Sequence, residues 1–327
     1  MSQMNPAQMD AVESLDTDSL DLEAGGAGGP KPTEKRLTRN QLVVRRFLRN
    51  KGGVIGLAVI ICLVLLAVIG PLAYPWKFND VDNYSFLKPP SGRHWMGTTQ
   101  DGRDLLALTM RGLGKSLIIG FCVAILSTAI AALVGSFAAY FGGWFEAATL
   151  WIIDLLLVIP SFLLIAIMTK GTSARSATQN EYAWLLLVLL LTAFSWVLSA
   201  RVVRSLAMSI KEREYIAAAK FMGLPAPVVI VRHLIPNIAS LLIIDATLNV
   251  SGAILTETSL SYFGFGVQAP DTSLGTLIGN GQQFALTFPW LFLVPAVLLV
   301  ILVFSVNAVG DGLRDAIDPS SSSGGKA

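Results

Sequence analysis

The chain has 327 residues, of which 53% are hydrophobic and 14% are charged, and its formal net charge is +2. A soluble protein carries about a quarter charged residues, so this composition excludes an ordinary soluble domain and indicates an integral membrane protein. The small net charge argues against a nucleic-acid partner. The two cysteines and two histidines lack the spacing of a metal site.

The N-terminal part of the chain changes sign of charge along its length. Residues 1–30 carry six acidic residues, no Lys or Arg, and end in GGAGGP, which predicts a disordered acidic cytoplasmic tail, with an interaction tail as the alternative. They lack the basic start and apolar core of a signal peptide. Residues 31–52 then carry eight Lys and Arg. This basic juxtamembrane segment predicts a cytoplasmic N-terminus by the positive-inside rule, and its RRFLRNKGG stretch fits a short amphipathic helix on the lipid headgroups.

Six apolar runs follow, and each is long enough to cross a hydrocarbon core of about 30 Å. The sequence therefore predicts an all-α membrane protein with both termini in the cytoplasm and a transmembrane domain over residues 53–319. Several Lys and Arg in the first outer loop weaken the charge rule, but the basic N-terminal segment outweighs them. The expected spans are about 53–73, 113–139, 145–168, 183–203, 237–263 and 289–309, with outer loops 74–112, 170–182 and 264–288, an inner segment 204–236, and a disordered tail 320–327.

The third expected span contains Asp154 and, six residues later, Pro160. An acidic residue inside a span is costly and is a functional candidate by default, and a proline interrupts the helix. Two interpretations of Asp154 arise, a structural or gating role and recognition of charge on a substrate.

The fifth expected span carries a polar stripe. Asp245 and Asn249 are four residues apart, and Gly252 and Thr256 continue the same helical side, next to Glu257. Such a stripe is penalised in lipid but not beside a water-filled path. These five residues are therefore candidates for lining a translocation pathway. Hydrogen bonding to neighbouring helices is an alternative of nearly equal weight.

The inner segment contains EYIAAAKFMGLPAPVVIVRHLIPN, residues 214–237. EYIAAAK is a good helix former with a carboxylate at its start and a cation at its end. Gly223 allows the chain to leave this helix, and the prolines at 225 and 227 fit the start of a second one. Two short helices at a membrane surface are too small for a domain. The segment is expected to be a docking site for another protein, and a simple linker is the alternative.

This segment resembles the EAA loop of bacterial ABC importer permeases. Glu214, Ala218, Ala219, Gly223, Ile235 and Pro236 match that motif, and the EY and RHLIPN elements are similar to the dipeptide/oligopeptide (DppC/OppC) permease family, C-type subunit. The resemblance implies a type I ABC importer permease fold. It also implies ATPase-coupling roles for a set of residues in this segment: Glu214, Tyr215, Ala218, Ala219, Gly223, Arg232 and Pro236.

Three further stretches resemble the same family in the same order. They are HWMGTTQDGRD at 94–104, ETSLSYFGFGVQAPDTSLG at 257–275 and NAVGDGLRDAIDP at 307–319, with departures at Thr99, Ala269 and Leu274. In the family the second stretch projects towards a substrate-binding protein. An Asp six residues before a Pro also recurs in the family's third span, which favours the structural or gating role for Asp154 and Pro160.

The resemblance implies a non-catalytic permease subunit of an ATP-driven importer of di- and oligopeptides in the bacterial inner membrane. Its expected partners are a B-type permease in a heterodimer, one fused or two separate ABC ATPase subunits, an extracytoplasmic binding protein, the peptide and membrane lipid. The chain contains no GxxxxGK[ST], so ATP and Mg are expected on the partner ATPases. No cofactor, metal or catalytic residue is expected in this chain.

Three other functions compete with this one. The same machinery could import a nickel chelate or glutathione. An ion-coupled secondary transporter could use Asp154, Asp245 and Glu257 as proton sites, although broken inverted-repeat helices are not evident in the sequence. A membrane enzyme could use the polar residues between His94 and Asp104, although nothing there positions a nucleophile or a cofactor.

Overall fold

The computed structural model describes residues 39–173 and 183–317. The chain divides into two compact units, 1–42 and 43–327. Helix α2 (Arg39–Arg49) begins in the first, and every later helix belongs to the second. The predicted acidic tail, most of the 170–182 loop and the 320–327 tail lie outside the described residues.

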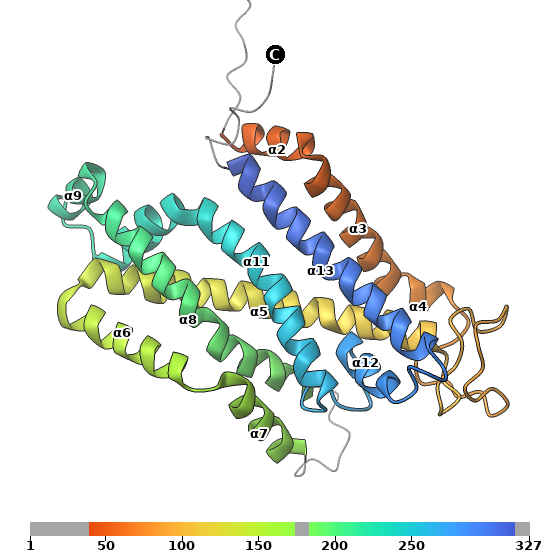
Figure 1. Ribbon diagram of the computed structural model, residues 1–327. Coiled ribbons are helices and arrows are strands. Elements are labelled where there is room, and N and C mark those ends of the chain that lie inside the picture. Colours follow the sequence, from red (N-terminus) through yellow and green to blue (C-terminus); the bar gives the residue numbers. More distant parts are fainter. Residues whose placement is uncertain (1–38, 174–182, 318–327) are drawn as a thin grey trace, which may run out of the picture. The chain divides into compact units, whose positions relative to one another are not determined.

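The described residues fold into helices without a strand (Figure 1). Five of these helices are long and apolar enough to cross a membrane, and a bent pair, α6 and α7, makes a sixth span when counted together. The prediction of an all-α membrane protein is thereby confirmed. In chain order the helices are α3 (Lys51–Val68), α4 (Gly70–Ala73), α5 (Leu105–Phe141), α6 (Gly143–Val158), α7 (Ser161–Ser173), α8 (Ala183–Lys211), α9 (Glu214–Phe221), α10 (Ala226–Val229), the π-helical turn η1 (Ile230–Leu234), α11 (Ile235–Tyr262), α12 (Leu274–Gln282) and α13 (Trp290–Ile317).

Helix α5 organises the bundle. It has 37 residues, about 55 Å at 1.5 Å per residue, and α8 and α11 pack along it (Figure 1). At Gly135 a Cβ atom would lie 2.6 Å from the carbonyl oxygen of Ala200 in α8. The two backbones therefore approach as closely as small residues allow in membrane helix pairs.

The first and last spans, α3 and α13, run side by side (Figure 1). A Cβ atom on Gly312 would meet the Cα of Gly53 at 2.8 Å, so these two glycines permit close contact. The side chain of Asn50 joins the N-terminus of α3 to the C-terminal part of α13. Its oxygen accepts from the Gly53 N–H (3.0 Å) and so caps α3, and its amide donates to Asp315 (2.9 Å). The first and last spans of the described chain are thus held together.

Several helix boundaries differ from those expected. α5 begins at Leu105, inside the expected first outer loop, because Asp104 caps its N-terminus through the Ala107 N–H. α8 continues to Lys211, eight residues beyond the expected end at 203. The expected outer loop 264–288 contains α12, whose start is capped by the side chain of Ser273. α13 extends to Ile317 rather than 309.

The third expected span is broken into two helices rather than kinked. α6 ends at Val158 and α7 begins at Ser161, and the two axes are bent by 71°. Pro160 lies in the break, where it lacks the N–H that a continuous helix would need.

The bundle has two ends that carry different elements (Figure 1). At the first, called here the α9 end, α8 finishes and α9, α10 and η1 lead into α11. At the second, the α12 end, the irregular segment 74–104 and α12 lie together and share a pocket lined by residues such as Arg103 and Asn280.

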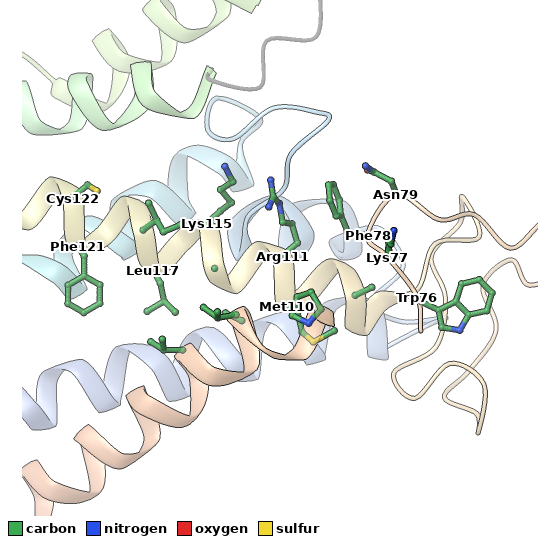
Figure 2. Close-up of a pocket in the computed structure, with 17 residues that line it drawn as sticks. Trp76, Lys77, Phe78, Asn79, Met110, Arg111, Lys115, Leu117, Phe121 and Cys122 are labelled. Atoms are coloured by element: carbon green, nitrogen blue, oxygen red, sulfur yellow. The ribbon is translucent and has the colours of Figure 1, made fainter. Parts of the chain in front are cut away.

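A groove of about 670 Å³ crosses the exposed face of α5 (Figure 2). One edge of the groove is α3, and the segment around Trp76–Asn79 closes its outer limit at the α12 end. Leu117 and Phe121 lie on the α3 side of α5, and Arg111 and Lys115 project from the other side (Figure 2).

Candidate functional site

The main candidate site is the α9 segment, defined as residues 214–237, which follows α8 and leads into α11. Glu214 lies in the first turn of α9 and Lys220 in the last, as the helix dipole favours. The chain then turns at Gly223, whose φ of +77° lies in the left-handed region that glycine adopts without a steric cost. The segment is a short helix followed by a sharp turn.

One side of the α9 segment is buried against the ends of two long helices. Ile216 and Val229 have no exposed surface. They cluster with Ala219, and Tyr140 of α5 and Ile210 of α8 pack against this cluster. Burial of large aliphatic side chains stabilises such an attachment by about 1.5–3 kcal/mol per residue. The segment is therefore attached to α5 and α8 by an apolar contact.

Two lysines reinforce the contacts around this attachment. The amine of Lys211, the last residue of α8, donates a 2.8 Å hydrogen bond to the carbonyl oxygen of Ala139 near the end of α5, which holds α8 against α5. The Lys220 amine lies 4.6 Å from the ring centroid of Tyr140, a favourable cation–π geometry. A displacement of α9 would consequently be transmitted to the end of α5.

The opposite side of the α9 segment is exposed and apolar. Phe221 and Met222 are 91% and 73% exposed, and Tyr215 and Val231 of the same segment are also exposed. Exposed apolar side chains in a short segment between two spans are candidates for contact with a partner or with the membrane surface. Phe221 and Met222 do not belong to the motif from which the coupling residues were taken. Their signal in the sequence is a pair of large apolar residues directly before the turn glycine.

The structure separates the seven predicted coupling residues into two groups. Ala219 is buried, because it lies three residues after Ile216 and so shares the inner face of α9. Its contribution is to the attachment, not to the exposed surface. The other six are exposed: Glu214, Tyr215, Ala218, Gly223, Arg232 and Pro236.

The polar stripe on α11 is covered at one end and open at the other. The Asn249 amide donates to Asp245 (2.9 Å), to Ser199 of α8 (3.2 Å) and, more weakly, to Thr128 of α5 (3.5 Å). Hydrogen bonding to neighbouring helices, the alternative interpretation of the stripe, therefore accounts for the part around Asp245 and Asn249. Further along the helix, Gly252 and Thr256 are exposed, and a Cβ atom on Gly252 would meet nothing within 4 Å.

Glu257 lies away from the stripe and inside the bundle, which differs from its expected place on a pathway. It has no exposed surface, and its carboxylate accepts hydrogen bonds from Ser116 of α5 (3.0 Å) and from Ser261 (2.5 Å). The Leu274 N–H at the start of α12 donates to the same Ser116 hydroxyl (3.3 Å). Glu257 thus connects α5, α11 and α12.

The acidic residue of the third span is paired with a cation. Asp154 of α6 forms an ion pair with Arg201 of α8, and Glu146 of α6 pairs with Arg204 of α8. These two pairs hold α6 against α8, one in the first turn of α6 and the other four residues before its end. The contacts of Asp154 are those of a structural residue.

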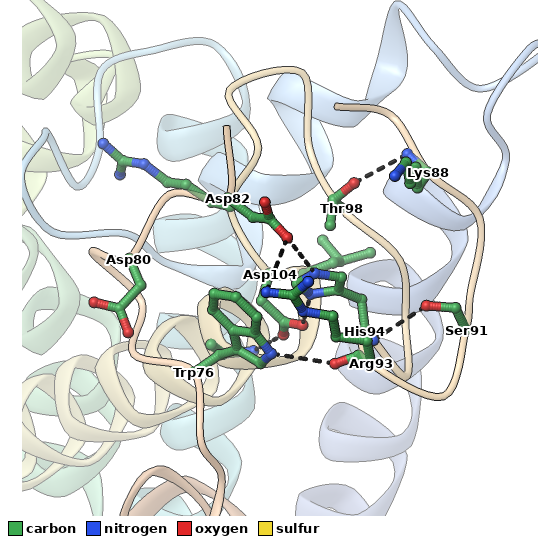
Figure 3. Close-up of polar contacts among 12 residues, drawn as sticks. Trp76, Asp80, Asp82, Lys88, Ser91, Arg93, His94, Thr98 and Asp104 are labelled. Atoms are coloured by element: carbon green, nitrogen blue, oxygen red, sulfur yellow. Dashed lines mark hydrogen bonds and ion pairs between the residues drawn. The ribbon is translucent and has the colours of Figure 1, made fainter. Parts of the chain in front are cut away.

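A buried polar cluster organises the segment 74–104 at the α12 end (Figure 3). The His94 ring lies between two carboxylates, with Nδ1 2.8 Å from Asp104 and Nε2 3.3 Å from Asp82. Asp104 also accepts from the Tyr74 hydroxyl (2.9 Å) and from the Ala107 N–H that starts α5. Structural hydrogen bonds therefore occupy both carboxylates and both ring nitrogens of His94.

Two pKa values reflect this packing. Burial, followed by the hydrogen bond to Asp104, raises the pKa of Tyr74 to about 12. The Tyr84 backbone N–H holds the pKa of Asp82 below its ordinary value against the opposing effect of burial, with further help from Ser85, His94 and Arg93. A lowered carboxyl pKa stabilises the fold above the ordinary Asp pKa, and this contribution is lost as the pH falls through the lowered value.

Replacing His94 with alanine is expected to destabilise the chain by about 1–3 kcal/mol, because Asp82 and Asp104 lose the ring that lies between them as a hydrogen-bond partner. Thermal unfolding of the purified protein measures this. Lys88→Ala serves as the control, since Lys88 is exposed in the same segment. Equal stability of the His94 and Lys88 variants would contradict the role of the ring.

Comparison with known proteins places the chain among membrane transport components. The family model for the binding-protein-dependent transport system inner membrane component matches residues 131–323, and the model for the N-terminal TM domain of oligopeptide transport permease C matches residues 38–90. The oligopeptide transport system permease protein OppC of Mycobacterium tuberculosis strain H37Rv is 51% identical over 286 residues, 88% of this chain and 96% of that protein. OppC of Bacillus subtilis strain 168 is 31% identical over 309 residues, 94% and 99% of the two chains.

The fold also has a counterpart among solved structures. A chain from an inward facing conformation of the MetNI methionine ABC transporter superposes with a TM-score of 0.50 and 20% identity, over 64% of this chain and 96% of that one. The architecture is the type I ABC importer permease fold. The chain therefore belongs to the family of binding-protein-dependent transport system inner membrane components, and it is a multi-pass protein of the inner membrane.

Proposed function

We propose that this chain is the C-type permease subunit of an ATP-driven importer of oligopeptides. The observation that carries the coupling part of this proposal is the two-sided α9 segment, apolar and exposed at Phe221 and Met222 but attached to α5 and α8 through Ile216 and Val229. Its 51% identical relative is described as an oligopeptide permease, which supports peptides as the cargo.

The α9 end faces the cytoplasm in this proposal. The basic segment 31–52 precedes the first span, and the positive-inside rule favours a cytoplasmic position for it. Four spans (α3, α5, the bent pair α6 and α7, and α8) separate it from the α9 segment, so the α9 segment returns to the same side. The α12 end then faces outwards, where an extracytoplasmic binding protein delivers the peptide.

The exposed side of the α9 segment docks into a partner ATPase, supplied as one fused or two separate subunits that hold ATP and Mg. Glu214, Arg232 and the apolar pair Phe221 and Met222 form the contact. Because the buried side is attached to α5 and α8, closure of the ATPases moves these helices as rigid bodies and switches access to the pathway.

A B-type permease subunit completes the pathway as the second half of a heterodimer. The open end of the α11 stripe supplies exposed small and polar groups at Gly252 and Thr256, which suit a water-filled path. The covered end, with Asn249 bonded to Ser199 and Thr128, holds α11 in place against α8 and α5.

The contacts of the intramembrane acids favour ATP-driven transport over ion coupling. Asp154 is paired with Arg201, Asp245 accepts from Asn249, and Glu257 accepts from two serines. A proton-coupling carboxylate needs access to water during the cycle, and the fully buried Glu257 lacks this access here.

The test compares peptide-stimulated ATP hydrolysis and peptide uptake in the reconstituted complex for wild type and a Glu214→Ala/Gly223→Asp variant. The variant removes the carboxylate of the first turn and places a side chain at the left-handed φ of residue 223, at a cost of about 1–2 kcal/mol. Stimulation and uptake are expected to be lost while the subunits still co-purify.

Glu212→Ala is the matched control, because Glu212 is exposed and lies just outside α9 and the motif. It is expected to retain stimulation. Wild-type coupling in the double variant would refute the role of the α9 segment, and peptide uptake that continues with inactivated ATPases would refute ATP-driven import.

A further inference from the structure

We propose that the groove on α5 binds an anionic diacyl phospholipid, with an acyl chain along the α3 edge and the headgroup phosphate at the α12 end. The proposal goes beyond the transport function and does not depend on the cargo. It rests on the shape of the groove, on the distribution of charge along it and on the order of polar and apolar groups along α5.

The volume and walls of the groove suit an acyl chain. Its volume of about 670 Å³ is within the range of about 300–1,000 Å³ that small-molecule sites occupy. Val64 and Val68 of α3 form one edge, and Leu117, Ile118 and Phe121 of α5 form the floor and the far end. Ile118 and Phe121 remain 46% and 40% exposed, so the floor of the groove is open to an occupant.

The lining changes character towards the α12 end. Three cations, Lys77, Arg111 and Lys115, line that part of the groove (Figure 2), and the described residues of the lining include no carboxylate. Asp271 lies behind it and pairs with Arg111 (2.8 Å) and Lys115 (2.6 Å), while Asp80 accepts from the backbone N–H of Lys77 (2.8 Å). Three cations against two carboxylates leave a net positive charge at this end.

The cations differ in their availability to a ligand. The Lys115 amine is buried, paired with Asp271 and lies 4.3 Å from the ring centroid of Trp184. Arg111 is 42% exposed although it pairs with Asp271, and Lys77 is exposed. Lys77 and Arg111 are therefore the groups that contact a phosphate, and Lys115 adds to the local positive potential.

The order of these groups along α5 matches the order of groups in a phospholipid. Arg111 and Lys115 lie towards the α12 end of α5, whereas Leu117 and Phe121 lie about 9–15 Å beyond Arg111 along the helix axis. The cations and the apolar side chains thus follow one another in the order of a headgroup and an acyl chain. This pattern selects an anionic lipid, since a basic side chain near a membrane surface contributes about a five-fold preference for negative lipids.

The experiment is native mass spectrometry of the complete transporter complex in mild detergent, titrated with phosphatidylglycerol or phosphatidylethanolamine of identical acyl chains. Wild type is expected to bind phosphatidylglycerol at least about five-fold more tightly than phosphatidylethanolamine. Lys77→Glu is expected to remove this preference. Lys88→Glu, the same charge change at an exposed lysine outside the groove, is expected to retain it.

A second pair of variants tests the acyl part of the site. A Cβ atom on Gly114 would meet only the Cβ of Ala67, at 3.7 Å, so Gly114→Leu fills the groove without disturbing a charge. It is expected to lower the binding of both lipids, whereas Ala129→Leu, at an exposed position further along α5, is expected to leave binding unchanged. Lipid binding that is insensitive to Lys77 and Gly114 would overturn the proposal.

A photo-reactive side chain at Ile118 identifies the occupant directly. Crosslinking to phospholipid in native membranes is the expected result. Crosslinking to the partner permease would overturn the proposal, because the groove would then be a contact between subunits.

Discussion

Gly135→Leu is expected to prevent the chain from accumulating as a folded membrane protein. A Cβ atom at this position would lie 2.6 Å from the carbonyl oxygen of Ala200 and 2.9 Å from the backbone nitrogen of Arg204. Both are main-chain atoms of α8, which cannot move aside as a side chain can, so α5 and α8 must separate. The expected loss is about 3 kcal/mol or more, a large part of the total stability of a typical domain.

The measurement is the yield of monodisperse protein extracted from membranes, together with its thermal unfolding midpoint. Ala129→Leu is the control, because it adds a similar side chain to an exposed position on the same helix. A normal yield and midpoint for Gly135→Leu would show that the close approach of α5 and α8 is dispensable.

Glu257→Leu is expected to have the second-largest effect, about 3 kcal/mol, and to act chiefly at the α12 end. The carboxyl group accepts from Ser116 and Ser261, and a buried hydroxyl that is left without its partner costs about 1–3 kcal/mol. The Ser261 hydroxyl in turn accepts from the Val267 N–H (3.1 Å). Loss of the carboxylate leaves both hydroxyls without their acceptor and loosens the chain that leads into α12.

Hydrogen exchange of the backbone amides over residues 263–282 measures this effect. Faster exchange is expected in Glu257→Leu, with a smaller change in Glu257→Gln, whose amide oxygen still accepts. Ser259→Leu, on the exposed side of the same helix, is expected to exchange like wild type. Unchanged exchange in Glu257→Leu would mean that α12 is held by its apolar contacts alone.

The apolar runs were sufficient to predict the helical fold because a membrane leaves the backbone few alternatives to helices. The ends of the helices were harder to predict, since they depend on single capping groups. Asp104 starts α5 before its apolar run begins, and Ser273 starts α12 inside an expected loop. Both residue types are preferred at N-caps, so the sequence did indicate these helix starts, but less strongly than hydropathy indicated the spans.

The site residues also divide into those whose place follows from the local helical period and those whose place depends on tertiary packing. Helical period alone explains why Ala218 is exposed and Ala219 buried, because the second shares a face with Ile216. The place of Glu257 could not be predicted in this way. Its partner Ser116 is 141 residues away in the sequence, and only the packing of α11 on α5 brings the two together.

The fastening of α3 to α13 has a consequence for biogenesis. Of the spans that the structure describes, α3 is the first to leave the ribosome and α13 is the last, and Gly53 cannot meet Gly312 until the intervening chain has been made. At about 5–20 residues per second, the first helix waits roughly 13–52 s for its partner. During that interval the face of α3 that later meets α13 is covered by lipid or by the insertion machinery, so this contact forms late in assembly.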